Sequence, residues 1–122
     1  MQKKKILITG CSGLVGSILS EALKEDYVIS GLDLKPSTVI DTTVADSTDL
    51  NAIGEAFHGV DIVIDLASNP NQYSSWNVIH GNNILCTVNA LELSRECGVK
   101  RVVFASSNHA TGMYESDLPY SD

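Results

Sequence analysis

The sequence has few cysteines, and they form no pair. Cys11, Cys86 and Cys97 are its three cysteines, and no Cys-x-x-Cys motif occurs. An odd number without close spacing indicates neither a disulfide framework nor a zinc site. No histidines, cysteines or carboxylates are clustered at ligand spacing either, so we expect no bound metal. This use of cysteine is typical of a reducing compartment, and we expect a cytoplasmic location.

Long apolar runs and an excess of basic residues are also missing. No stretch approaches the roughly 18 apolar residues of a membrane span. Lys3 to Lys5 precede only three strongly apolar residues, Ile6 to Ile8, whereas a secretory signal needs roughly 7 to 15 of them. Eight basic residues against 15 acidic ones give a net charge of -7, without a basic stripe to follow a row of phosphates. We therefore expect neither a membrane nor a nucleic acid as a partner.

What the sequence does contain is an alternation of strand and helix patterns. Apolar runs predict strands at residues 3–9, 27–33, 61–66 and 101–105, and a weaker one at 39–44. Helices are predicted at residues 14–25, at 76–97 with Gly98 as a stop signal, and in a short segment that is capped within 46–49 and ends at Phe57. Such alternation predicts an α/β fold with a doubly wound parallel sheet of the Rossmann type and about five strands. We expect one domain over residues 1–122, with an irregular tail at 113–122.

A glycine-rich turn joins the first predicted strand to the first predicted helix. Gly10, Gly13 and Gly16 stand at three-residue intervals. They can serve a tight turn, a close approach of the backbone to a pyrophosphate, and close packing of helix on strand. The start of the helix favours an anion through its free N–H groups and its dipole, and Ser12 can add a hydroxyl. The sequence of strand, glycine turn and helix therefore predicts a dinucleotide site.

An acidic residue at the end of the second predicted strand favours NAD over NADP. Asp33 can accept hydrogen bonds from the ribose hydroxyls of the adenosine, and it would repel the 2′-phosphate of NADP. No arginine follows it. Lys35 acts in the opposite direction, because a nearby cation could partly accommodate that phosphate. On balance, the sequence predicts NAD as the cofactor.

The segment from Thr9 to Gly16 reads Thr-Gly-x-x-Gly-x-x-Gly. It resembles the extended branch of the short-chain dehydrogenase/reductase family, which contains NAD-dependent sugar epimerases, dehydratases and uronate dehydrogenases. The resemblance covers essentially the whole chain. It implies that the cofactor is bound by Gly10, Ser12, Gly13, Leu14, Val15, Gly16, Asp33, Leu34, Asp46, Ser47, Leu66, Ala67, Ser68, Asn83 and Ser106.

Two of these positions carry an alternative or a departure from the family pattern. Asp46 matches an aspartate that contacts the adenine, although its carboxylate could also cap the following helix. The segment 66–68 resembles the family's His-x-Ala-Ala segment beside the nicotinamide ribose. Asp65 stands there in place of the histidine.

A third motif falls within the long predicted helix. Asn83 opens a segment that resembles the family's Asn-x-x-Gly-Thr motif, whose asparagine helps to order the active-site hydrogen bonds. Cys86 stands where the family usually has glycine. Alternatively, Asn83 and Thr87, four residues apart, simply share a helix face against the sheet.

Residues 101–112 resemble the strand and loop that carry the family's catalytic serine. We expect Ser107 to orient the reacting oxygen and to stabilise charge as hydride moves. Ser107-Asn108-His109 is similar to a segment of uronate dehydrogenases, so Ser68, Ser107, Asn108 and His109 are the expected substrate contacts. His109 could instead be an exposed loop residue without proton chemistry.

The acid/base pair of the family, Tyr-x-x-x-Lys, does not occur in these 122 residues. We therefore expect an amino-terminal, catalytically incomplete NAD-binding part of a sugar epimerase, dehydratase or uronate dehydrogenase. It would act on a sugar or sugar acid only when completed. The alternative is a stand-alone NAD-binding regulatory module, or a subunit that a second chain completes. The resemblance also implies a homodimer through the helix at residues 76–97.

Overall fold

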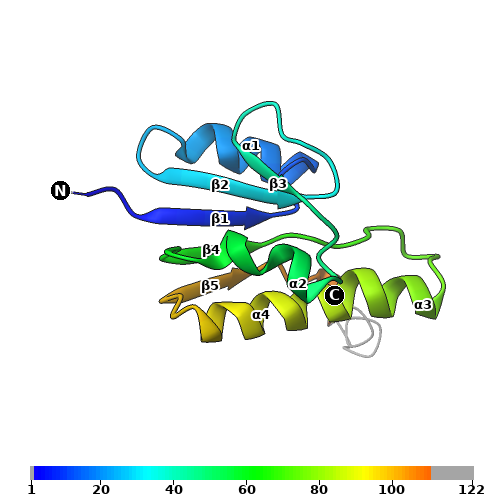
Figure 1. Cartoon of the computed structure of the whole chain (residues 1–122). Helices are drawn as coiled ribbons and strands as arrows, with labels where there is room; N and C mark the ends of the chain where they lie inside the picture. The colour runs from blue at the N-terminus through cyan, green and yellow to red at the C-terminus, as the bar shows by residue number, and fades with distance from the viewer. Residues whose placement is uncertain (1, 111–122) are drawn as a thin grey trace, which may run out of the picture.

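A computed structural model describes residues 2–110, which form a parallel sheet with helices on both faces (Figure 1). The tail expected at residues 113–122 lies outside the described residues. Neighbouring strands are parallel and follow the order β3-β2-β1-β4-β5. This Rossmann-type sheet confirms the predicted fold. Its strands are β1 (Lys5–Thr9), β2 (Val28–Asp33), β3 (Thr42–Val44), β4 (Ile62–Asp65) and β5 (Arg101–Phe104).

Helices cover the two faces of the sheet unequally (Figure 1). One face carries α1 (Leu14–Leu23), and the other carries the remaining helices. These are α2 (Leu50–Ile53) with the 3-10 turn η1 (Gly54–Phe57), and then the continuous helical stretch α3 (Trp76–Ile79), η2 (His80–Leu85) and α4 (Cys86–Glu96). The short 3-10 turn η3 (Asn108–Ala110) follows β5. No helix within residues 2–110 is long and apolar enough to cross a membrane.

Two apolar clusters hold these layers together. Successive residues of a strand point to opposite faces, so Ile6 and Ile8 of β1 face α1, while Leu7 faces the other helices. Burial on both faces explains why three successive residues of the central strand, Ile6 to Ile8, are apolar. The cluster under α2 and α4 consists of Leu7, Leu32, Ile53, Phe57, Val60, Val63, Ala90 and Leu93.

Two predicted elements differ in detail from the structure. β3 begins only at Thr42, because the Ser37 hydroxyl oxygen accepts hydrogen bonds from the N–H groups of Val39 (3.0 Å) and Ile40 (3.3 Å). These bonds build a turn in place of the first half of the predicted strand. The helix predicted over residues 76–97 is present, but its middle section, η2, is π-helical. A π-helical section has more residues per turn than an α-helix, so it changes the directions of the side chains that follow it.

β1 and β4 are neighbours in the sheet but are not consecutive in the sequence. The chain runs outward from β1 to β3 and then returns to start β4 on the other side. In open α/β sheets such a reversal leaves a crevice at the carboxyl ends of the strands, where ligands bind. Thr9, Asp33 and Asp65 end β1, β2 and β4. The fold thus brings the glycine turn and two carboxyl groups to the crevice.

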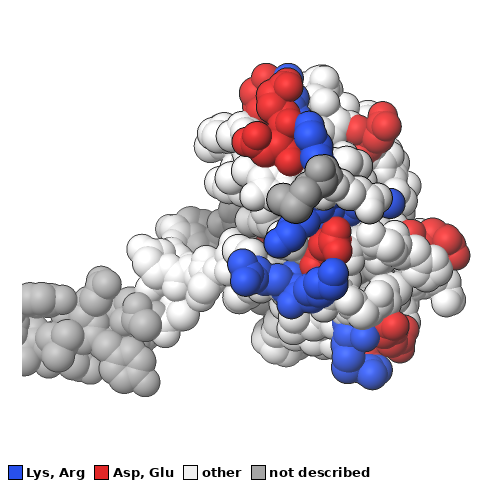
Figure 2. Space-filling model, turned by 90° about the vertical axis from the view of Figure 1, so that its left-hand side faces the viewer, with Lys and Arg blue, Asp and Glu red and all other residues white. Residues whose placement is uncertain are grey.

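Basic side chains gather at the opposite end of the sheet, where the strands begin. Lys5 and Arg101 begin β1 and β5. Figure 2 shows lysines and arginines at this end, interspersed with acidic side chains. An ion pair there joins Lys100 Nζ to Asp61 Oδ1 at 3.3 Å. Because solvent screens exposed ion pairs, this pair adds little to stability.

Candidate functional site

The glycine turn is shaped by close backbone contacts. Gly10 has a φ of +69°, and a Cβ atom there would lie 2.8 Å from the carbonyl carbon of Leu66. A Cβ on Gly16 would overlap the carbonyl oxygen of Gly10 and lie 2.7 Å from Cys11 Cα. Gly13 has more room, since its nearest neighbour would be 3.4 Å away. Two of the three glycines are therefore required by the turn itself, and Gly13 leaves its outer side open.

The first turn of α1 presents free N–H groups to the crevice. Gly13 is the N-cap residue and offers no side-chain cap, and no acidic residue lies in the first turn. The first N–H groups of a helix have no partner within the helix, and the dipole adds positive potential. The predicted residues Leu14 and Val15 are 81% and 55% exposed, and neither lines the two clefts described below.

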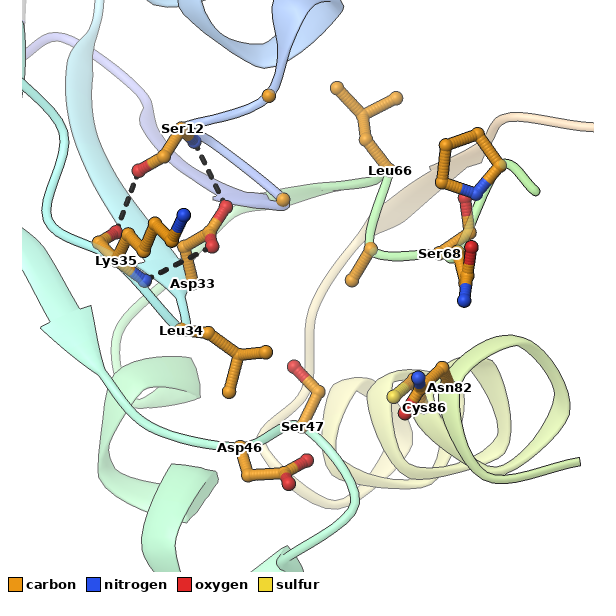
Figure 3. A pocket seen from close by; sticks show the side chains of 15 residues that line it. Ser12, Asp33, Leu34, Lys35, Asp46, Ser47, Leu66, Ser68, Asn82 and Cys86 are labelled. Carbon is orange, nitrogen blue, oxygen red and sulfur yellow. Dashed lines mark hydrogen bonds between the residues drawn. The ribbon is translucent and has the colours of Figure 1, made fainter. Parts of the chain in front are cut away.

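Asp33 is held at the crevice by two backbone N–H groups (Figure 3). The N–H of Ser12 donates to Oδ2 at 3.0 Å, and that of Lys35 donates to Oδ1 at 3.2 Å. The Ser12 hydroxyl donates to the carbonyl oxygen of Lys35 at 2.6 Å. A carboxylate has roughly four acceptor positions, so each oxygen keeps capacity for a further donor. The glycine turn and the loop after β2 are thus locked around a carboxylate that can still bind hydroxyl groups.

These groups border a cleft of about 460 Å³. Its other walls come from the segment after β3, the loop after β4 and the long helical stretch (Figure 3). Among the predicted cofactor residues, it is lined by Gly10, Ser12, Gly13, Asp33, Leu34, Asp46, Ser47, Leu66, Ala67 and Ser68. Lys35, Asn69, Pro70, Asn82 and Cys86 line it as well and were not in that set. Two of these had a signal in the sequence: Lys35 follows Asp33 as a nearby cation, and Cys86 replaces the glycine of the Asn-x-x-Gly-Thr motif.

Asp46 borders this cleft without capping α2. Its Oδ1 accepts hydrogen bonds from the N–H and the hydroxyl of Thr48, at 2.9 and 2.8 Å. These bonds hold the pKa of Asp46 below its ordinary value. The helix is capped by Asp49, whose carboxylate accepts from the N–H groups of Asn51 and Ala52. The capping role considered for Asp46 is therefore wrong, because Asp49 stands one residue before the helix and Asp46 does not.

A second cleft, of about 890 Å³, lies between the loop after β4, the helix and the segment after β5. Ser107 is fixed there through its hydroxyl oxygen, which accepts the N–H of His109 at 3.1 Å. Asn108 belongs to η3 but is not among the residues that line either cleft. The predicted residues that line this one are Leu66, Ala67, Ser68, Asn83, Ser106, Ser107 and His109.

Asn83 joins the helix to the loop after β4. Its Oδ1 accepts the N–H of Asn69 at 2.7 Å, and its Nδ2 donates to the carbonyl oxygen of Asn69 at 3.1 Å. Thr87, four residues further on, lines the same cleft. Asn83 therefore does more than pack on the sheet, because its amide fixes the backbone of a loop that borders both clefts.

Burial raises the pKa of two acidic groups beside the clefts. Asp65 is 3% exposed, and its burial raises the pKa of its carboxyl group although the neighbouring Thr9 and Thr87 hydroxyls lower it. Burial, together with the negative charges of Asp46 and Asp65, raises the pKa of the Cys86 thiol to about 11. Near pH 7 this thiol is therefore protonated and a poor nucleophile. Across residues 2–110, no group of three or more His, Cys, Asp or Glu side chains is placed to hold a metal ion.

Comparison with known proteins shows similarity along nearly the whole chain. The model of the NAD dependent epimerase/dehydratase family matches residues 6–122. An L-arabinose 1-dehydrogenase (NAD(P)(+)) from Haloferax volcanii is 37% identical over 110 residues, which are 90% of this chain and 43% of that protein. A uronate dehydrogenase from Pseudomonas putida is 31% identical over 119 residues, with 93% of this chain and 44% of that protein covered.

Solved structures share the fold. A variant of the uronate dehydrogenase from Agrobacterium tumefaciens, complexed with NAD, has a TM-score of 0.78 and 30% sequence identity. The match covers 87% of this chain and 42% of that one. This chain thus spans less than half the length of the relatives it matches. Because the family model matches all but the first five residues, the chain belongs to the NAD dependent epimerase/dehydratase family.

Proposed function

We propose that this chain is the NAD-binding part of an NAD-dependent sugar dehydrogenase, epimerase or dehydratase. The observation that carries the proposal is the arrangement at the first cleft, where the glycine turn, the free start of α1 and the Asp33 carboxylate meet. The start of α1 suits a pyrophosphate, and Asp33 suits the hydroxyls of a ribose. The NAD complex of a related uronate dehydrogenase supports the choice of cofactor.

The two clefts suggest how the cofactor is accommodated. Asp46 and Ser47 border the first cleft beyond Asp33, where they can contact the adenine end. Leu66, Ala67 and Ser68 line both clefts, so they can guide the nicotinamide end from the first toward the second. When bound, NAD supplies the capacity to accept or donate hydride. The residues of this chain bind the cofactor and orient it.

The second cleft is the proposed place of a sugar or sugar acid. The Ser107 hydroxyl, held by the N–H of His109, can donate its hydrogen to a substrate oxygen. Ser68 and His109 line this cleft and are further proposed contacts. Asn108 stands between Ser107 and His109 in the sequence and is proposed as well, although it does not line the cleft. The names of the L-arabinose and uronate dehydrogenases support this substrate class. Because the 122 residues lack a Tyr-x-x-x-Lys pair, we expect them to bind NAD without turning over a sugar by themselves.

Calorimetric titration with NAD and with NADP tests this function. We expect saturable NAD binding and weaker NADP binding. Asp33→Ala should weaken NAD binding about tenfold, the loss expected for hydrogen bonds to a charged group, and should abolish the preference for NAD. Lys35, which borders the same cleft, should support the remaining NADP affinity, so Lys35→Ala is expected to weaken NADP binding more than NAD binding.

The exposed Asp26→Ala serves as the control for a lost surface charge and should leave both affinities unchanged. If the folded chain does not bind NAD, the proposed function is wrong. If Asp33→Ala leaves both affinities unchanged while the chain binds NAD, only the assignment of Asp33 to the ribose is wrong.

A homodimer through the long helical stretch is a further part of the proposal. Trp76, Ile84, Val88 and Leu91 are 66%, 43%, 52% and 48% exposed. Val88 and Leu91 are three residues apart in α4 and lie on one face of it, and Ile84 precedes them in η2. A stripe of exposed apolar side chains on a helix favours association.

Light scattering at high protein concentration is expected to give the mass of a dimer, and Val88→Glu is expected to give that of a monomer. Val28→Glu is the matched control, because Val28 is 51% exposed and lies outside this helix. A monomeric parent chain at high concentration would contradict the proposed dimer.

A further inference from the structure

A buried carboxyl group lies at the junction of the two clefts, and the proposed function gives it no role. Asp65 is the last residue of β4 and is 3% exposed. It also lines the second cleft. Burying a carboxyl group costs free energy unless hydrogen bonds compensate for the lost water. Its hydrogen-bond partners therefore indicate what it does.

The hydroxyl of Thr9 connects Asp65 to the loop after β4. This hydroxyl donates to Asp65 Oδ1 at 2.6 Å. Its oxygen also accepts the N–H groups of Leu66 and Ala67, each at 3.1 Å. A hydroxyl has one hydrogen and two lone pairs, so these three bonds use its whole capacity. Because the carboxyl group accepts the hydrogen bond that this hydroxyl donates, both lone pairs of the hydroxyl oxygen are directed at the loop.

The peptide between Leu66 and Ala67 is in contact with the glycine turn. A Cβ on Gly10 would lie 2.8 Å from the carbonyl carbon of Leu66 and 2.9 Å from the nitrogen of Ala67. The N–H of Leu66 has a second acceptor, the carbonyl oxygen of Thr9 at 3.2 Å. Among the described residues, the N–H of Ala67 has no acceptor other than the Thr9 hydroxyl. The placement of this peptide thus depends on the direction in which the hydroxyl points.

We propose that Asp65 is a positioning residue of the cofactor site, which orients the Thr9 hydroxyl and thereby holds the peptide between Leu66 and Ala67 against the glycine turn. The inference rests on the proposed function, since NAD is the ligand that this peptide would contact. Thr87 of α4 is a second polar neighbour of this carboxyl group and lowers its pKa. Neither Asp65 nor the Thr9 hydroxyl needs to touch the cofactor for this role.

Removing either partner is expected to weaken NAD binding without abolishing it. Asp65→Leu and Thr9→Val should each raise the Kd for NAD about fivefold, the effect of roughly one hydrogen bond. Asp65→Asn and Thr9→Ser retain an acceptor and a hydroxyl, and they should stay within about twofold of the parent chain. Affinity is measured by calorimetry, and the unfolding midpoint in urea is measured on the same samples.

The double variant Thr9→Val/Asp65→Leu separates positioning from a merely structural role. Each single change leaves a buried polar group without its partner, whereas the double change removes both, so the unfolding midpoint should recover in part. Affinity should not recover, and it should fall no further than in Thr9→Val, because Asp65 acts through Thr9. Ser94→Ala removes a buried hydroxyl elsewhere on α4 and should leave NAD affinity unchanged.

Equal NAD affinities of Asp65→Leu and the parent chain would overturn the inference. The inference would also be overturned if the NAD affinities of the variants changed in parallel with their unfolding midpoints, so that affinity recovered in the double variant. If Asp65→Leu fails to fold, Thr9→Val and Thr9→Ser test the same hydroxyl, and equal NAD affinities of those two would overturn it. In each of these cases the parent chain still binds NAD, which distinguishes this failure from failure of the proposed function.

Discussion

Gly16→Ala is expected to destabilise the chain by about 3 kcal/mol or more, the upper range for overpacking in a tightly packed site. The added Cβ would overlap the carbonyl oxygen of Gly10 and lie within 2.9 Å of two backbone atoms of Cys11. These atoms belong to the glycine turn, so they cannot move aside as a flexible side chain can. Urea unfolding followed by circular dichroism measures the effect. Where the variant still folds, we expect NAD binding to be lost, because the turn must shift.

Gly54→Ala and Gly13→Ala are the controls for this prediction. At Gly54 the backbone is helical and the nearest atom to an added Cβ is a Leu93 methyl group 3.9 Å away, so the change should be neutral or stabilise by up to about 1 kcal/mol. Gly13→Ala should keep the fold, since its Cβ would have room, but it would place a methyl group at the cleft. If Gly16→Ala were as stable as the parent chain, the packing described for the turn would be wrong.

The fold could be predicted from the sequence because its signals are local. β1 is apolar on both faces, and a glycine turn and an amphipathic helix follow it, so the pattern is readable within twenty residues. The details that differed depend on hydrogen bonds that leave no pattern. Hydrogen bonds to the Ser37 hydroxyl form a turn where the first half of the third strand was predicted. The π-helical section η2 carries Asn83, whose partner Asn69 is fourteen residues away.

The residues of the site likewise fall into those with a local sequence signal and those without one. The glycine turn and Asp33 were predicted because each stands at the end of a recognisable strand. By contrast, the buried Cys11 fits only because Gly31 of β2 has no side chain, and a Cβ there would overlap the sulfur. Asp65 meets Thr9 because β4 pairs with β1 in a register that sets these two residues opposite each other. Such contacts follow from strand order and register, which a single sequence does not specify residue by residue.

Cys86 is expected to make the stability of the chain fall in alkaline solution. Burial, and then the charges of Asp46 and Asp65, raise the pKa of its thiol from an ordinary value of 9.0 to about 11. The folded chain thus holds this proton more tightly than the unfolded chain. Its stabilising contribution is complete below about pH 9 and is lost as pH rises toward 11. Two pH units correspond to roughly 2 to 3 kcal/mol.

Urea unfolding of the parent chain and of Cys86→Ala, from about pH 8 to about pH 11, measures this contribution. The stability difference between the two should shift in favour of the variant by that amount as pH rises. Ser94→Ala is the control, because it alters a buried, non-titrating side chain of the same helix, and its difference from the parent should stay constant. A constant difference for Cys86→Ala would mean that water reaches the thiol. The wall of the first cleft formed by α4 would then be open, and the cofactor would be held chiefly by the glycine turn and Asp33.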